Sequence, residues 1–248
     1  MPRRPPHSLK APVAPIRWAE SFIELIFPER CLFCRAVLPP GAGRALCSSC
    51  GRLFSPVGFI CPACENLASG DSSCRCLTDL PFLKSLFALA FYEDQWRLLL
   101  HNLKYGGRRS LARPLGRWLG FEIMQGQPCR PDLVVPVPLH RRREKERGFN
   151  QSRLIADHAA RVMGKPALPL LAKNRDTLSQ TTLSRRERLE NVSGAFSALP
   201  GSLEGASVLL IDDVYSTGST LKEGARVLHA RGAVVSGAVI AYNPSAVK

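Results

Sequence analysis

The chain has 248 residues, of which 45% are hydrophobic and 22% are charged. This length allows one sizeable domain and a second, small one, with enough apolar residues for a proper core. Lys and Arg number 34 against 20 Asp and Glu, and the net charge of +14 favours partners that carry phosphate, from nucleotides to DNA. No run reaches the roughly eighteen apolar residues of a membrane span, and no secretory signal is recognisable. We therefore expect a cytoplasmic protein.

The N-terminal region contains two predicted segments. Residues 1–15 carry several Pro and Arg side chains and predict a flexible tail. Apolar residues at helical spacing follow over residues 16–27 and stop at Pro28, which predicts a short helix packed against the neighbouring part of the chain. A helix bound to a membrane surface is the alternative, and Glu20 and Glu24 make it less attractive.

Eight of the nine cysteines lie within residues 31–76, in closely spaced pairs. Two thiolates of one turn can reach the same tetrahedral cation, so the spacing predicts two structural zinc sites in a double zinc ribbon, which together with the helix covers residues 16–80. Chain order suggests that the first zinc is bound by Cys31, Cys34, Cys47 and Cys50 and the second by Cys61, Cys64, Cys74 and Cys76. Crossed pairing is an alternative, and disulfides would require an oxidising compartment.

Strand-like and helix-like segments alternate over residues 85–248. The predicted strands are 86–92, 133–137, 168–171, a segment at Phe196, 208–211 and 234–241. The predicted helices are 94–103, 111–124, 151–163 and 221–230. Such alternation predicts an α/β domain with a mainly parallel sheet and helices on both faces, in which ligands bind at the carboxyl ends of the strands.

The most informative segment is Val208–Thr220. An apolar strand leads into Asp212 and Asp213, and a loop of small hydroxyl residues and glycine, 216–220, opens a helix. Free N–H groups and the helix dipole favour a phosphate at such a point, while paired carboxylates suit sugar hydroxyls or a hydrated divalent cation. The Asp-bearing strand of a P-loop NTPase is the alternative, but the sequence lacks the Gly-x-x-x-x-Gly-Lys-Ser/Thr loop. The pattern predicts a phosphosugar site.

Several segments together resemble a known family. Val208–Thr220 is similar to the phosphoribosyl diphosphate (PRPP) signature of type I phosphoribosyltransferases. Four further motifs extend the resemblance: Leu103-Lys-Tyr-Gly-Gly107, Val135-Pro-Val-Pro-Leu139, Arg147-Gly-Phe-Asn-Gln151 and Arg175-x-Thr-x-x-Gln180. With the cysteine-rich front region, the chain resembles the ComF-type competence proteins, which combine such a domain with a zinc ribbon.

The resemblance implies binding of PRPP with Mg²⁺ and displacement of pyrophosphate at C1 of the ribose, with Asp212 and Asp213 as the catalytic pair. It further implies that the signature residues cradle the 5′-phosphate, that a basic loop contacts the pyrophosphate and that a hood closes over the ligand. The implied PRPP-binding residues are Tyr215, Ser216, Thr217, Gly218, Ser219, Thr220, Lys104, Pro138, Leu139, His140, Arg143, Arg175, Thr177, Gln180 and Arg188.

The sequence favours two functions over a third, a PRPP-sensing regulator, because nothing in it resembles a helix-turn-helix. One is a PRPP-binding phosphoribosyltransferase linked to DNA uptake or nucleotide metabolism. The other is a non-catalytic competence protein that keeps the fold and binds single-stranded DNA or proteins of the competence machinery. The net charge suits both, and the residues give no dedicated set of groups for an acceptor substrate.

Overall fold

The computed structural model describes residues 28, 30–39, 45–54, 56–64, 66, 82–126, 130–176 and 192–244. The predicted tail (1–15), the predicted helix 16–27 and two predicted zinc ligands, Cys74 and Cys76, lie outside the described residues. Within the described part, no helix is long and apolar enough to cross a membrane.

The centre of the molecule is a five-stranded sheet with the strand order β1-β2-β7-β6-β3. Four strands run parallel: β2 (Leu86–Phe91), β7 (Val234–Tyr242), β6 (Ser207–Tyr215) and β3 (Leu133–Pro136). Strand β1 (Gly58–Ile60) pairs antiparallel with β2 at one edge. A separate antiparallel pair joins β4 (Leu171–Lys173) to β5 (Phe196–Ala198). The predicted mainly parallel sheet is confirmed.

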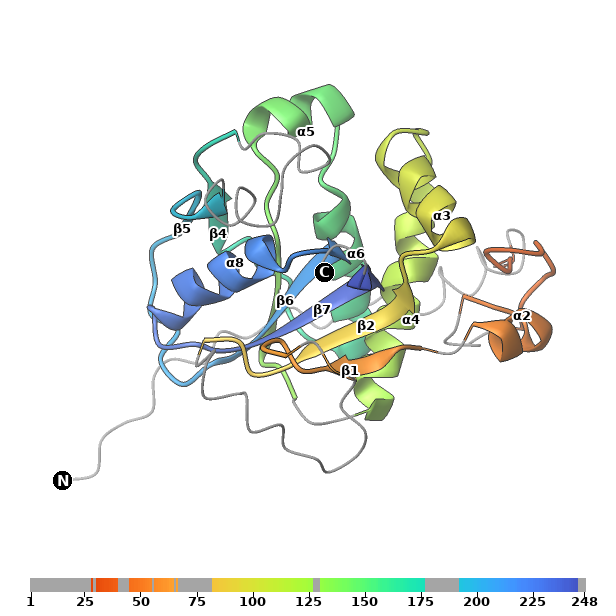
Figure 1. The fold of residues 1–248 in the computed structure, drawn as a ribbon, viewed down its shortest axis with the longest axis horizontal. Coiled ribbons are helices and arrows are strands. Elements are labelled where there is room, and N and C mark those ends of the chain that lie inside the picture. The colour runs from red at the N-terminus through yellow and green to blue at the C-terminus, as the bar shows by residue number, and fades with distance from the viewer. Residues whose placement is uncertain are drawn as a thin grey trace.

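Helices cover both faces of this sheet (Figure 1). The helices are α2 (Ser48–Leu53), α3 (Asp94–Lys104), α4 (Ala112–Gly126), α5 (Arg141–Arg147), α6 (Gln151–Met163) and α8 (Ser219–His229), with a 3-10 turn, η2, at Arg109–Leu111. Alternate residues of β6 point to opposite faces, so Leu209 and Ile211 pack with α3, α4 and α6, while Val208 and Leu210 pack with α8. The sheet is therefore buried on both sides.

Two glycines allow α4 and α6 to pack closely. A Cβ at Gly116 would lie 2.4 Å from the carbonyl oxygen of Ile155, and one at Gly120 would lie 2.7 Å from that of Ala159. The absence of these Cβ atoms brings the backbones together and fixes where α6 begins relative to β6. That placement matters because the first turn of α6 reaches the acidic end of β6.

Residues on both sides of the predicted boundary between zinc ribbon and main domain share one core. Cys31, Leu32 and Leu46 belong to the same cluster of buried residues as Leu100 and Trp118 of α3 and α4. Strand β1, which lies within the predicted ribbon, hydrogen-bonds to β2 of the main sheet. The division into residues 16–80 and 85–248 stays a prediction, and the described parts of the two segments pack as one body.

Candidate functional site

The signature segment forms the carboxyl end of β6, a tight loop and the first turn of α8. Strand β6 continues to Tyr215, so Asp212 and Asp213 lie within the strand, near its carboxyl end, and not after it. Gly218 has a φ of 73° and is the N-cap of α8. A Cβ at this position would lie 2.2 Å from the Tyr215 hydroxyl, so both the backbone conformation and the space require glycine.

The loop presents its polar groups around a small hollow. Thr217 and Ser219 are 2% and 4% exposed, and their hydroxyls are 2.9 Å apart. A small cavity at the loop is lined by Asp212 and by residues 214–221. Gly218, the N-cap of α8, offers no side chain to accept hydrogen bonds from the backbone N–H groups of the first turn. Such a helix start suits an anion.

Two other helices hold the acidic pair. Asp212 Oδ1 accepts a hydrogen bond of 2.8 Å from the Ser152 hydroxyl at the start of α6, and one of 2.9 Å from the backbone N–H of Asp213. Lys104, the last residue of α3, places its Nζ 2.6 Å from Asp213 Oδ2. Asp212 and Asp213 are only 8% and 5% exposed. The acids and the signature loop thus meet at one edge of the sheet, with a lysine from a distant motif beside them.

Burial determines the charge state of this cluster. Loss of solvent, followed by the neighbouring charge of Asp213, raises the pKa of Asp212 to about 7, although the hydrogen bonds and Lys104 oppose the shift. Burial by itself would lower the pKa of Lys104, but the charge and hydrogen bond of Asp213 and the charge of Asp212 outweigh it, and the pKa is raised. Lys104 therefore stays cationic while Asp212 titrates near neutral pH.

The predicted basic loop follows β3 and continues into α5. His140 is the N-cap of α5, and its Nδ1 lies 3.8 Å from Asp176 Oδ1. Arg143 Nε lies 3.3 Å from the same oxygen. Asp176, which the sequence did not single out, thus contacts two predicted ligand-binding residues. Its carboxylate offsets part of the positive charge of this segment.

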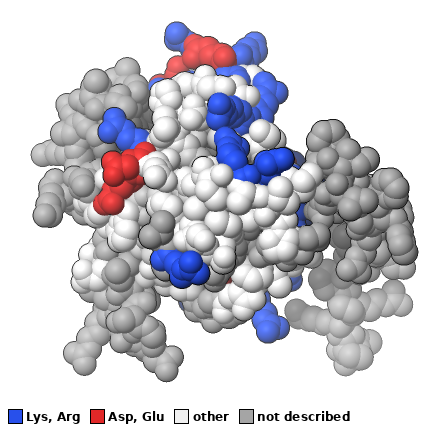
Figure 2. All heavy atoms as spheres, turned by 90° about the vertical axis from the view of Figure 1, so that its right-hand side faces the viewer, with Lys and Arg blue, Asp and Glu red and all other residues white. Residues whose placement is uncertain are grey.

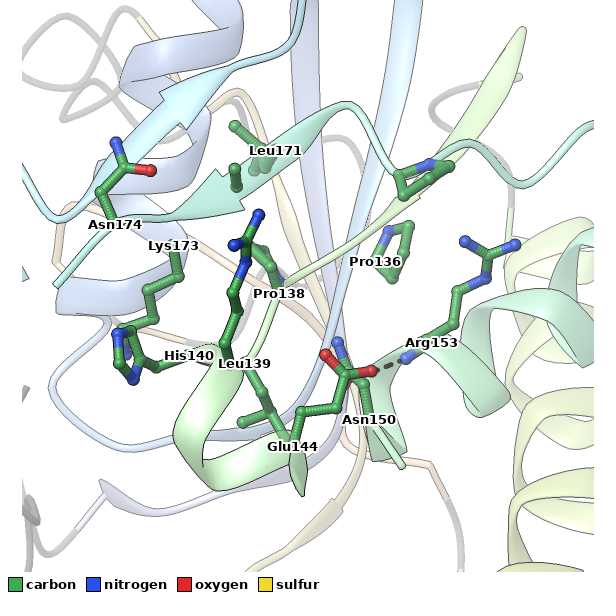
Figure 3. Close-up of a pocket in the computed structure, with 13 residues that line it drawn as sticks. Pro136, Pro138, Leu139, His140, Glu144, Asn150, Arg153, Leu171, Lys173 and Asn174 are labelled. Carbon is green, nitrogen blue, oxygen red and sulfur yellow. Dashed lines mark hydrogen bonds between the residues drawn. The ribbon is translucent and has the colours of Figure 1, made fainter. Parts of the chain in front are cut away.

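A cavity of about 490 Å³ lies between this loop and strand β4. Pro138 and Leu139 line it, together with Asn150 and Arg153 at the start of α6 and with all three residues of β4. Figure 3 shows Lys173 and His140 on one side of the cavity and Arg153 on the other. None of the signature residues 212–220 lines it. The cavity is therefore lined by predicted PRPP-binding residues of the loop after β3 and by none of the signature loop.

The remaining predicted ligand-binding residues fall into three groups. Tyr215 is 1% exposed, and its ring packs in the core beneath Gly218, 5.8 Å from the ring of Tyr242, which makes it a support for the loop. Arg175 donates to the carbonyl oxygen of Ser193. Thr177, Gln180 and Arg188 lie outside the described residues, so the predicted hood is not tested.

Four of the predicted zinc ligands come together. The sulfur atoms of Cys31, Cys34, Cys47 and Cys50 all lie within 4.8 Å of one another, as four ligands of one metal ion should. The prediction that these four cysteines form one group is confirmed, and the cluster could bind one zinc. Cys61 and Cys64 are described, but their predicted partners are not, so the second site stays a prediction.

An aromatic cluster connects the cysteine cluster to α3. Phe33 and Phe54, which lie in and beside the cysteine turns, have ring centroids 4.4 Å apart. Trp96 in the first turn of α3 stands 5.3 Å from Phe33 and 5.5 Å from Trp118 of α4. Helix α3 therefore begins at the cysteine cluster and ends at Lys104, beside Asp213.

Sequence reasoning missed three residues near the site: Ser152, Lys173 and Asp176. Ser152 directly follows the Arg147–Gln151 motif, and its position in the first turn of a capped helix was the one available signal. Nothing local distinguishes Lys173 or Asp176 from ordinary surface residues. Their proximity to the site follows from how β4 returns to the sheet edge.

A loop suited to phosphate, together with paired acids at the carboxyl end of a central parallel strand, is typical of a phosphoribosyltransferase-type domain. The family model described as "Phosphoribosyl transferase domain" matches residues 150–248. The chain is 34% identical to the DNA utilization protein YhgH of Escherichia coli O157:H7, over 84% of this chain and 94% of that protein. It is 28% identical to competence protein F of Haemophilus influenzae (83% and 93% covered) and 30% identical to competence protein ComFC of Bacillus subtilis (77% and 80% covered). The chain belongs to the ComF-type family of phosphoribosyltransferase-like proteins.

The pKa of Asp212 leads to a prediction about stability. An unfolded Asp titrates near pH 4, whereas Asp212 in the fold titrates at about 7. The stabilising neutral form is fully present below about pH 4, and its contribution is lost as the pH rises through about 7. Asp212→Asn keeps an acceptor for Ser152 but cannot ionise. We expect it to raise the free energy of unfolding at pH 8 by on the order of 2 kcal/mol, and by much less at pH 4.

Urea unfolding at pH 4, 6 and 8 checks this expectation. The control is Asp157→Asn, which removes a partly exposed ion pair with Arg153 and should change stability by about 0.5 kcal/mol or less. A lower stability of Asp212→Asn than of the wild type at pH 8 would contradict the assignment of a destabilising buried charge.

The aromatic cluster leads to a prediction about metal removal. Because Trp96 links the cysteine cluster to the shared core, a strong chelator should lower the melting temperature of the whole protein by roughly 5 °C or more. Calorimetry should show one transition, and tryptophan fluorescence should change in parallel. Cys34→Ser should lower the melting temperature without chelator, and chelator should then lower it by less than in the wild type. Two transitions, the upper one unchanged by chelator, would show that the main sheet does not depend on the cluster.

Proposed function

We propose that this protein binds PRPP and has the apparatus for phosphoribosyl transfer. The observation that carries the proposal is the meeting of the signature loop with Asp212 and Asp213 at one end of β6. The N–H groups at the start of α8 and the hydroxyls of Thr217 and Ser219 suit the 5′-phosphate. The carboxylates suit the ribose hydroxyls as acceptors.

The leaving pyrophosphate requires positive charge that acts more strongly in the transition state than in the ground state. His140 at the start of α5 and Arg143 in its first turn are suited to this role, and their shared partner Asp176 would hold them in place until the diphosphate binds. Arg175 directly precedes Asp176, on the segment that leads into the predicted hood. Cationic groups near the pyrophosphate and carboxylates near the ribose together support displacement of pyrophosphate at C1.

The acidic pair fits sugar hydroxyls better than direct coordination of a metal. Lys104 already places a positive charge 2.6 Å from Asp213, at the point where a divalent cation would bind the pair. Mg²⁺, where it takes part, would therefore reach the site bound to the diphosphate and neutralise charge there. Lys104, which the resemblance implies as a PRPP-binding residue, is better suited to hold the Asp213 carboxylate in position.

The names of the relatives extend this proposal to DNA uptake or DNA use, and a second candidate function follows from the surface. Figure 2 shows Lys and Arg scattered over one face of the molecule, at the top, in the middle and in patches lower down, with the acidic side chains gathered at the top and at the left edge. Tyr105, directly after α3, is 68% exposed, and the Arg147 guanidinium lies 5.0 Å from the centre of its ring. An exposed aromatic ring among basic side chains suits single-stranded DNA.

The first function is tested by the double variant Asp212→Asn with Asp213→Asn. Loss of both carboxylates should weaken PRPP binding in the presence of Mg²⁺ by at least about 100-fold, or about 2.7 kcal/mol, as measured by titration calorimetry. Release of pyrophosphate should then be assayed with candidate bases and amines. Asp132→Asn is the control, because Asp132 accepts from Ser207 N–H at the opposite end of β6 and should leave the affinity unchanged. An unchanged affinity of the double variant would refute the site.

The second function is tested by binding of an unstructured oligonucleotide at several salt concentrations. We expect affinity to fall steeply with salt, because basic side chains displace counterions. Tyr105→Ala should weaken binding about tenfold through lost stacking. Leu98→Ala is the control, because Leu98 is an exposed aliphatic residue of α3, and it should have little effect. Binding that responds to neither salt nor Tyr105→Ala would remove this candidate.

A further inference from the structure

Two of the motifs that carry the family resemblance contain residues to which the proposed site gives no role. The motif at the end of α3 includes Lys104, whose ammonium group contacts Asp213. The motif between α5 and α6 directly precedes Ser152, whose hydroxyl contacts Asp212. Each motif therefore lies beside a group that holds one of the acids, and its other residues are candidates for the same task.

The two motifs contact each other through a reciprocal pair of cation–π contacts. The Arg147 guanidinium lies 5.0 Å from the ring centre of Tyr105, which follows α3. In return, the Arg109 guanidinium, from the turn after this motif, lies 4.8 Å from the ring centre of Phe149. A cation within about 6 Å of a ring centre is attracted by the face of the ring. We call this pair of contacts the arginine clasp.

Gly148 leaves room for one half of the clasp. Its φ is 78°, and a Cβ at this position would lie 2.5 Å from Nη2 of Arg109. The Arg109 side chain therefore passes directly over the backbone of Gly148 to reach Phe149, which is buried in the main core. A larger residue at position 148 would displace the guanidinium and strain the backbone.

On one side the clasp reaches Asp212 through the start of α6. Arg147 donates a hydrogen bond from Nη1 to Oε1 of Gln151, a buried residue. Ser152 is the next residue, and its hydroxyl, likewise buried, donates to Asp212 over 2.8 Å. A shift of the Arg147 guanidinium would therefore move the first turn of α6, and with it the donor to Asp212.

On the other side the clasp reaches Asp213 through the end of α3. Tyr105 is the C-cap of α3 and directly follows Lys104, whose Nζ lies 2.6 Å from Asp213 Oδ2. Within the described part of the chain, the ring of Tyr105 meets His101 of the same helix and the Arg147 guanidinium. Arg147 thus supplies the link from the last turn of α3 to α6.

We propose that the arginine clasp is a positioning device that holds Ser152 and Lys104 around the acidic pair as one unit. Arg147 acts through these two residues and is therefore a positioning residue. The inference rests on the proposed PRPP function, because the placement of the acids affects affinity only if they accept from the ribose. Carboxylates that are already in place need no ordering when the sugar binds.

Titration calorimetry of the full-length protein with PRPP and Mg²⁺ tests the clasp. Arg147→Met removes the guanidinium, and Tyr105→Ala removes the ring. We expect each change to weaken PRPP binding about tenfold through the lost cation–π contact. The double variant should bind no more weakly than Arg147→Met alone, because the same contact is already lost. Tyr105→Phe keeps the ring and should bind within about twofold of the wild type.

Lys145→Met is the matched control for charge, because Lys145 is an exposed cation of α5 that takes no part in the clasp. Its loss should change the affinity for PRPP by less than about twofold, since solvent and salt screen such a charge. A loss as large as that of Arg147→Met would show that long-range charge, and not the clasp, controls binding. Additive losses in the double variant, or an equal loss in Tyr105→Phe, would also overturn the proposal.

The titration of Asp212 without ligand separates this inference from the proposed function. Burial, followed by the charge of Asp213, raises the pKa of Asp212 to about 7. The Ser152 hydrogen bond and the Lys104 charge oppose this shift. Lys173 of β4 also faces the acid and stays unchanged in every variant. The carboxyl carbon resonance of Asp212 in NMR spectra, assigned by its absence in Asp212→Asn, follows the titration.

We expect the titration midpoint of Asp212 to rise by roughly half a pH unit in Arg147→Met and in Tyr105→Ala, because the groups that favour its ionised form are less well placed. Lys145→Met should leave the midpoint unchanged. An unchanged midpoint in both clasp variants overturns the proposal, whatever their affinity for PRPP. A raised midpoint with unchanged PRPP affinity overturns the role of the clasp in binding. Absence of PRPP binding by the wild type refutes the proposed function, and the titration then decides whether the clasp positions the acids.

Discussion

Two adjacent carboxylates buried at the end of the central strand, with one lysine to balance them, are the constraint on which the site depends. Asp212 is held by Ser152 of α6 and Asp213 by Lys104 of α3, so the acids fix where both helices meet β6. Lys104 contacts Asp213, and burial together with the neighbouring charge of Asp213 raises the pKa of Asp212 to about 7. Burying two adjacent carboxylates lowers the stability of the fold. Proteins usually retain such destabilising groups at functional sites.

The cysteine cluster contributes to the same constraint from the other end of α3. Trp96 packs against Phe33 beside the cysteine turns, eight residues before Lys104, and the intervening helix is rigid and buried along one side. The position of the ammonium group near Asp213 is therefore tied to the packing of the cysteine cluster. Strand β1 also forms one edge of the sheet by pairing with β2. The N-terminal segment therefore supports the packing around the site.

Local chemistry predicted the strands of the parallel sheet and its longer helices, but it took α5 (Arg141–Arg147) as part of a loop and began β4 (Leu171–Lys173) three residues too early. The helix over Gln151–Met163 was predicted with its observed bounds, and in the structure Asn150 caps its start and Gly164 adopts the left-handed conformation at its end. The signature strand was expected to stop at Ile211, where the acids begin. It continues because Asp212 and Tyr215 still pair with Val239 and Tyr242 of β7, which no local pattern reveals. For the same reason, the partners of Asp212 and Asp213 could not be read from neighbouring residues.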